Sequence, residues 1–136
     1  MLRMDKKYNF VFIFIALAIA DQLVKYLIRQ SGGFYVCNKG IAFSLPMPWW
    51  IIYSVFFIFF LLAGFYLIER ISLKEYLINK YGLTLLVGGA LGNIIDRLNY
   101  GCVTDFINLM IFPVFNLADI FIFIGVILIF FRSNKK

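Results

Sequence analysis

The sequence predicts an all-α integral membrane protein with four membrane-spanning helices. Of its 136 residues, 63% are hydrophobic and 15% are charged, and the mean hydropathy is +0.92. Soluble domains carry roughly 45–50% apolar and about 25% charged residues, and small domains bury the smallest fraction of their surface. The apolar excess must therefore face lipid. The length fits one domain, so residues 1–136 are expected to form a single membrane unit.

Four segments are apolar enough to cross a bilayer, which takes about 20 helical residues. They are expected at residues 8–28, 49–68, 81–98 and 114–131. Residues 69–80, between the second and third, are expected to form a short surface helix. The first 20 residues also resemble a signal peptide, with a basic start and an Ala-Ile-Ala site at 18–20. Because the apolar character resumes after Asp21, we expect a retained span instead.

Basic residues at the ends of these segments predict the orientation. Nine lie on the side of the two termini: Arg3, Lys6, Lys7, Arg70, Lys74, Lys80, Arg132, Lys135 and Lys136. Three lie on the opposite side: Arg29, Lys39 and Arg97. The positive-inside rule therefore puts both termini in the cytoplasm and the loops 29–48 and 99–113 outside. The net charge of +6 is explained by this topology, and no nucleic-acid partner is expected, because the basic residues form no stripe with exposed aromatics.

The two outer loops differ from the spans. Residues 34–36 predict a short strand, and Asn-Lys-Gly at 38–40 predicts a turn. Residues 103–114 are too polar to span and too apolar to be solvated, so we expect them along the membrane interface. Cys37 and Cys102 both fall in these loops. A disulfide between them is compatible with this placement, and nothing in the sequence requires it.

Four carboxylates lie inside or beside the spans and all at the outer side: Asp21, Asp96, Asp105 and Asp119. Ionisable residues at such positions are rare and commonly functional. Simpler explanations exist for the first two. Asp21 and Lys25 are spaced to pair along one helix face. Asp96 and Arg97 could mark the end of the third span, although the small residues beside them predict a face packed against protein.

The other two carboxylates also have simpler explanations. Asp105 could be an ordinary loop residue. Asp119 stands three residues after Asn116, as in a capping box at the start of the fourth span. Against these alternatives, the loop between Asp105 and Asp119 can fold back so that the two carboxyls meet.

The absence of histidine narrows the chemistry open to a hydrolase. It excludes Ser–His and Cys–His pairs, and two isolated cysteines without histidine do not make a usual zinc site. A serine with a lysine base remains, although the spacing does not favour it; the candidates are Ser31, Ser44, Lys25 and Lys39. Two aspartates sharing a proton are better placed, with Asp105 and Asp119 acting as acid and base.

Five segments resemble the lipoprotein signal peptidases (signal peptidase II), in that family's order. They are residues 21–25 (DQLVK), 38–43 (NKGIAF), 88–97 (GGALGNIIDR), 101–106 (GCVTDF) and 115–119 (FNLAD). Each is weak alone, but together they are highly specific and extend from the first span to the fourth. The stretch between Asp105 and Asp119 is short for the family.

The resemblance implies an intramembrane aspartic endopeptidase of bacterial inner membranes. Such enzymes remove the signal peptide from diacylglyceryl-modified prolipoproteins, cutting before the lipidated cysteine. The implied catalytic residues are Asp105 and Asp119. The implied substrate-binding residues are Asn38, Asn93, Arg97 and Asn116, and the site-supporting residues are Asp21 and Lys25.

The resemblance further implies a small extracytoplasmic β-cradle after the first span and an active site on the extracytoplasmic side. Neither a metal nor a cofactor is implied. The expected partners are the prolipoprotein substrates and membrane lipid, and the protein is expected to be a monomer.

Two other classes of protein fit parts of this sequence. A small four-span multidrug transporter would use a carboxylate in the first span, as Asp21 would be. The strong basic bias and the outer-loop position of Asp105 disfavour a transporter. A non-enzymatic membrane scaffold would leave the outer carboxylates without a role.

Overall fold

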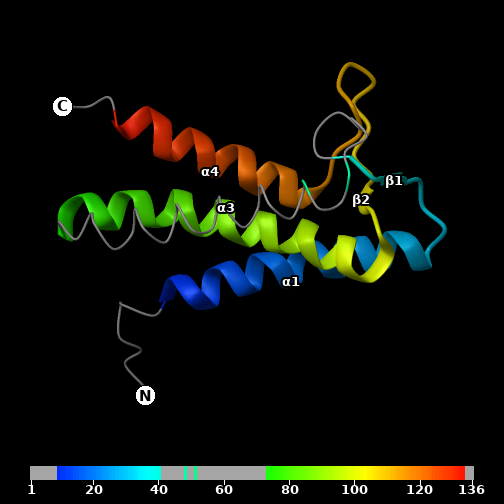
Figure 1. Ribbon diagram of the computed structural model, residues 1–136, viewed down its shortest axis with the longest axis horizontal. Coiled ribbons are helices and arrows are strands. Elements are labelled where there is room, and N and C mark those ends of the chain that lie inside the picture. Colours follow the sequence, from blue (N-terminus) through cyan, green and yellow to red (C-terminus); the bar gives the residue numbers. More distant parts are fainter. Residues whose placement is uncertain (1–8, 41–47, 49–50, 52–72, 134–136) are drawn as a thin grey trace.

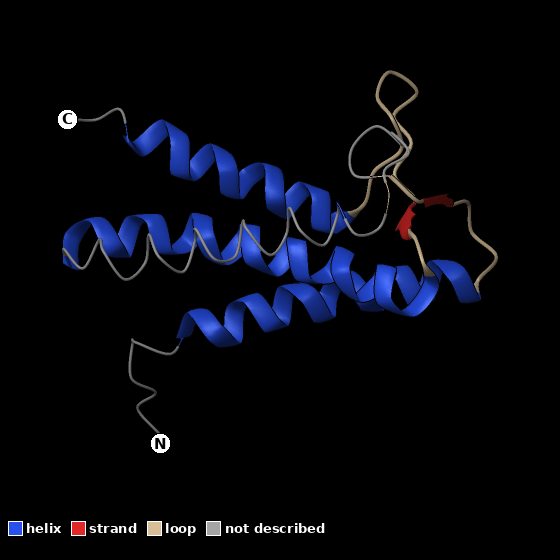
Figure 2. Ribbon diagram, viewed as in Figure 1, coloured by secondary structure: helices blue, strands red, loops and turns tan. Residues whose placement is uncertain are grey.

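A computed structural model describes residues 9–40, 48, 51 and 73–133. In these ranges it contains three helices and two short strands: α1 (Asn9–Gln30), β1 (Val36–Asn38), α3 (Leu73–Tyr100), β2 (Val103–Asp105) and α4 (Leu117–Ser133). The three helices run along the long axis, and α3 packs against both α1 and α4 (Figure 1). The two strands lie together at one end of the bundle (Figure 2).

The described helices overlap three of the four predicted spans, and α4 begins at Leu117 rather than at 114. Among the described residues, Phe10–Gln30 is the one helix long and apolar enough to cross a membrane. The apolar part of α4, Leu117–Ile129, is shorter. The predicted span 49–68 lies outside the described residues, apart from position 51. That the chain has four membrane-spanning helices therefore stays a prediction.

The start of α3 differs from the prediction. The helix begins at Leu73 rather than at 81, so most of the segment 69–80 belongs to α3 instead of to a separate surface helix. The physical reason is that neither proline nor glycine interrupts the chain between 73 and 81, so nothing ends the helix there.

Close helix contacts at small residues hold the bundle together. A Cβ added at Gly89 would clash with the backbone oxygen of Ala118 in α4. A Cβ at Gly92 would lie 2.6 Å from a carboxylate oxygen of Asp21 in α1. These two glycines therefore allow α3 to approach both neighbours closely, as the small residues of this segment predicted.

The strands form a two-stranded antiparallel sheet in which Val36 pairs with Asp105 and Asn38 with Val103. The first strand lies two residues later than predicted. Cys37 and Cys102 form a disulfide with a Cα–Cα distance of 5.4 Å, within the usual range for such bonds. Because an isolated pair of short strands is only marginally stable, this covalent link helps to hold the sheet.

The chain between β2 and α4 forms an apolar loop. Ile107 and Phe115 bridge its base, and four large apolar side chains are exposed along it: Leu109, Met110, Ile111 and Phe112. The loop projects sideways from the bundle, near the start of α4 (Figure 1). Its apolar surface fits the predicted place along a membrane interface, and that place stays a prediction.

Candidate active site

Asp105 and Asp119 line the same cavity, which has a volume of about 680 Å³. Asp105 ends β2, and Asp119 lies in the first turn of α4. The other lining residues are Asn38, Asn93, Arg97, Val103, Leu109, Phe112, Pro113, Val114, Phe115, Ile120 and Phe123. The fold thus brings the two predicted carboxyls, called the carboxyl pair below, to one largely apolar chamber.

Asp105 is held by amides on both of its oxygens. Asn38 Nδ2 donates to Oδ2 at 2.8 Å, and Asn116 Nδ2 donates to Oδ1 at 2.6 Å. Asp105 is only 2% exposed. This burial raises the pKa of the Asp105 carboxyl above its usual range; the two amide donors lower the pKa, and the nearby charge of Asp119 raises it further. Asp105 is therefore disposed to hold a proton.

Asp119 is held by two different donors. Asn93 Nδ2 donates to Oδ1 at 2.8 Å, and the backbone N–H of Asn116 donates to Oδ2 at 3.1 Å. The backbone N–H of Asp119 in turn donates to Asn116 Oδ1 at 3.0 Å. This reciprocal pair is the capping box that the sequence suggested. The box uses only one carboxylate oxygen, so capping does not account for the bond to Asn93.

The orientation of each asparagine amide is fixed by a group that can only donate. Asn38 Oδ1 accepts from the backbone N–H of Gly40 at 2.9 Å, and Asn93 Oδ1 accepts from Lys25 Nζ at 3.0 Å. Asn116 Oδ1 accepts from the first-turn N–H of α4. Since ammonium and backbone N–H groups have no acceptor, each Nδ2 must face the carboxyl pair.

The predicted substrate-binding residues divide into two groups. Asn38, Asn93 and Arg97 line the cavity, whereas Asn116 is fully buried and is not among the lining residues. Arg97 donates to the backbone oxygen of Gly40 at 2.8 Å, which connects α3 to the chain after β1.

Asp21 and Lys25, which are expected to support the site, do not line the cavity. Both are fully buried, and Lys25 Nζ lies 2.7 Å from Asp21 Oδ2 and 3.4 Å from Asp96 Oδ2. Asp21 Oδ1 also accepts from the backbone N–H of Ala118 at 2.9 Å, which ties α1 to the start of α4. A simple pair along one helix face is therefore an incomplete explanation of these two residues.

Four residues outside the predicted site complete this polar network: Gln22, Arg29, Asp96 and Thr104. Gln22 donates to Asp96 Oδ1 at 3.2 Å, and Arg29 donates to Thr104 Oγ1 at 2.6 Å. One signal could have found Arg29: with Asp21 and Lys25 it forms a four-residue spacing along one face of α1.

The alternative sites gain no support from these contacts. Ser31 is exposed and donates to the Ile28 carbonyl, whereas Lys25 is buried among carboxylates. Ser44 lies outside the described residues. Asp21, which a transporter would need for its cargo, is fully buried and paired. In the described part of the chain, no three cysteine or carboxylate side chains are placed to hold a metal ion.

Comparison with solved structures identifies the class of protein first. The chain is similar to a structure described as a bacterial membrane enzyme, solved by the in meso method at 1.9 Å resolution. The TM-score is 0.76 at 31% identity, and the match covers 94% of each chain. Together with the apolar bundle and the cavity with its carboxyl pair, this likeness identifies a membrane enzyme.

Sequence comparison then identifies the family. The family model for signal peptidase II matches residues 13–135, so the chain belongs to the signal peptidase II family. A lipoprotein signal peptidase from Caldicellulosiruptor bescii is 44% identical over 105 residues, covering 75% of this chain and 66% of that protein. A lipoprotein signal peptidase from Moorella thermoacetica is 38% identical over 137 residues, covering 87% and 89%.

Proposed function

We propose that this protein is an aspartic endopeptidase that removes the signal peptide from diacylglyceryl-modified prolipoproteins, cutting before the lipidated cysteine. The observation that carries the proposal is the carboxyl pair at one apolar cavity, with amide donors fixed toward both acids. Membership of the signal peptidase II family supports the same activity. An apolar chamber of this kind suits a substrate that carries lipid chains.

The geometry supports different roles for the two acids. Asp119 lies at the N-terminus of α4, where the helix dipole favours a negative charge, and it is less buried than Asp105. Asp119 is therefore the base, and the more buried Asp105 holds the proton. Water attacks the scissile carbonyl carbon, gives a proton to Asp119, and the carbonyl oxygen takes the proton of Asp105. The C–N bond then breaks as Asp119 protonates the leaving nitrogen, and a hydroxyl of the tetrahedral intermediate returns its proton to Asp105 as the new carbonyl forms.

The other site residues hold the substrate or the acids. Asn38, Asn93 and Arg97 line the cavity and can contact the substrate backbone. Asn116 is fully buried and acts through Asp105. No step of this chemistry uses a metal or a cofactor.

We further propose that residues 1–136 form one four-span, monomeric enzyme of the bacterial inner membrane, in contact with membrane lipid. Both termini are placed in the cytoplasm, and the cavity on the extracytoplasmic side. The basic residues support this orientation. The disulfide supports it independently, because disulfides persist in oxidising compartments, and this one lies in the sheet beside the cavity.

One assay tests the activity. Purified protein is incubated in lipid with a prolipoprotein whose cysteine carries diacylglycerol, and with the same protein lacking the lipid. We expect a shortened product that ends before the cysteine, from the lipidated form only. Folded protein that leaves the lipidated form intact would contradict the proposed function.

A further inference from the structure

Thr104, the residue before Asp105, is bound through both of its polar groups. Its backbone N–H donates to Asp96 Oδ2 at 2.8 Å, and its hydroxyl accepts from Arg29 Nη1 at 2.6 Å. Thr104 is 2% exposed. The sheet of the described residues has two strands, so the edge of β2 away from β1 would otherwise lack partners. Asp96 of α3 binds the backbone N–H of Thr104 at that edge, and Arg29 of α1 binds the Thr104 side chain.

Arg29, near the end of α1, is itself held by two residues at the end of α3. Its Nη1 lies 3.4 Å from Asp96 Oδ1, and its guanidinium stacks over the Tyr100 ring at 4.1 Å from the centroid. The side chain of Arg29 is only 14% exposed and Asp96 is fully buried. Such a desolvated, stacked guanidinium has little freedom to move. It is therefore a rigid support for the hydroxyl that it binds.

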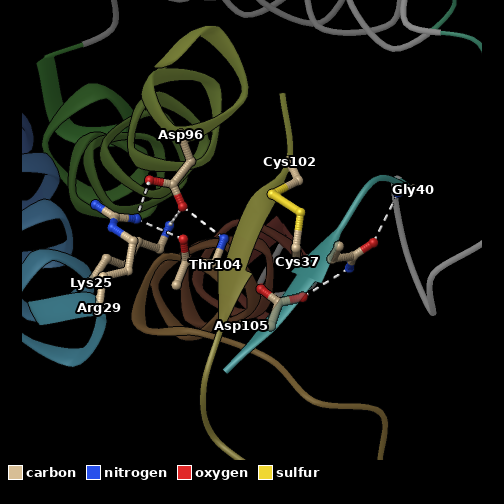
Figure 3. Close-up of a disulfide and its surroundings, with 9 residues drawn as sticks. Lys25, Arg29, Cys37, Gly40, Asp96, Cys102, Thr104 and Asp105 are labelled. Carbon is tan, nitrogen blue, oxygen red and sulfur yellow. Dashed lines mark hydrogen bonds and ion pairs between the residues drawn. A yellow bond between two sulfur atoms is a disulfide. The ribbon is translucent and has the colours of Figure 1, made fainter. Parts of the chain in front are cut away.

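We propose that Arg29 and Asp96 are positioning residues, which fix Thr104 and thereby place the Asp105 carboxyl against its catalytic partner. Figure 3 shows Arg29, Asp96 and Thr104 on one side of β2, and the disulfide with Asp105 on the other. Thr104 and Asp105 are consecutive residues of β2, so movement of the Thr104 backbone displaces Asp105 directly. The two helices thus determine the position of an acid that neither of them carries.

This inference rests on the proposed function, in which the position of Asp105 matters to the rate. A misplacement of about 1 Å can reduce a rate by roughly 10²-fold. Neither Arg29 nor Thr104 lines the cavity. Their loss should therefore affect kcat while leaving KM nearly unchanged.

The test is Thr104→Val, which removes the hydroxyl but keeps the shape and the backbone N–H. The matched control is Thr84→Val, another buried threonine, whose hydroxyl donates to the Lys80 carbonyl in α3. We expect kcat per folded molecule to fall about tenfold to a hundredfold in Thr104→Val and to stay within about twofold in Thr84→Val. Arg29→Met should lower kcat similarly, and the double variant should be no worse than Arg29→Met alone.

Amide hydrogen exchange at residues 103–106 gives a readout that does not depend on activity. We expect faster exchange there in Thr104→Val and Arg29→Met, and unchanged exchange in Thr84→Val. Wild-type kcat in folded Thr104→Val, or equal exchange in all variants, would overturn the inference. If exchange changes as expected but wild-type protein cleaves nothing, the proposed function fails while the support of β2 stands.

Discussion

The site has two halves that the chain builds in different ways. Asn93 and Asp119 are carried by helices, whose close approach is allowed by small residues such as Gly89. Asn38 and Asp105 are carried by a sheet of two three-residue strands. The helical half is held by extensive packing, whereas the sheet half depends on a few specific links. An acid on a small sheet can therefore be placed accurately only if other elements hold that sheet.

The largest expected effect is a loss of cleavage, and it should be the same whichever half of the site is changed. Asp105→Asn and Asp119→Asn should each abolish measurable cleavage, because general acid–base catalysis typically contributes about 10²–10⁴-fold. The double variant should be no worse than either single variant, since residues that act as a unit are not additive. Cleavage of a lipidated prolipoprotein per folded molecule is the measurement. A folded variant with a tenth of wild-type activity would remove that aspartate from the catalytic pair.

The next prediction concerns the helical half alone, through the buried charge of Lys25. Lys25→Met leaves Asp21 and Asp96 without their shared cation. Removing one partner of a buried ion pair costs about 3–5 kcal/mol, so a large fall in the melting temperature is expected. Lys39→Met, the same change at an exposed lysine, is the control. Equal melting temperatures in detergent for the two variants would show that this cluster does not stabilise the bundle.

Breaking the disulfide should act on the sheet half. The double variant Cys37→Ser with Cys102→Ser opens a link between residues 65 apart, and such links contribute about 2–4 kcal/mol. We expect a lower melting temperature and reduced kcat, and the same result when wild-type protein is reduced. Since the chain has two cysteines, reductant should not affect the double variant. If reductant lowers the melting temperature or kcat of the double variant, the loss on reduction does not come from this disulfide.

The smallest effect is a shift in pH dependence. A raised pKa keeps Asp105 protonated to higher pH than an ordinary aspartate, so activity should fall as pH rises through that pKa. This fall forms the high-pH limb of the profile of kcat/KM against pH, and its apparent pKa belongs to the carboxyl pair rather than to one acid. Asn38→Leu removes a hydrogen-bond donor that favours the charged form of Asp105. The high-pH limb of this variant should therefore lie at higher pH than that of the wild-type protein. A limb at lower pH in a profile of kcat/KM would contradict this assignment.

The sequence predicted the helical half more fully than the sheet half. Spacing within one helix is visible in the sequence, and it correctly grouped Asp21 with Lys25 and Asn116 with Asp119. The strand was placed at 34–36 rather than at Val36–Asn38, because a short strand is defined by its partner.

The contacts that hold the sheet half were missed or left open for a related reason. Arg29 and Thr104 are 75 residues apart, and Cys37 and Cys102 are 65 apart. No local pattern specifies which faces of distant elements meet. Only the fold brings these residues together.

The fixed amides have a consequence for which substitutions the site tolerates. Conversion of Asn38, Asn93 or Asn116 to aspartate, by mutation or by slow chemical deamidation, keeps the shape and the bond on the oxygen side. It replaces the Nδ2 donor with an oxygen that faces an existing carboxylate, so a third negative charge competes for the protons of the pair. The most conservative exchange in shape is thus the most disruptive in charge, and we expect deamidation of a single one of these amides to lower the activity.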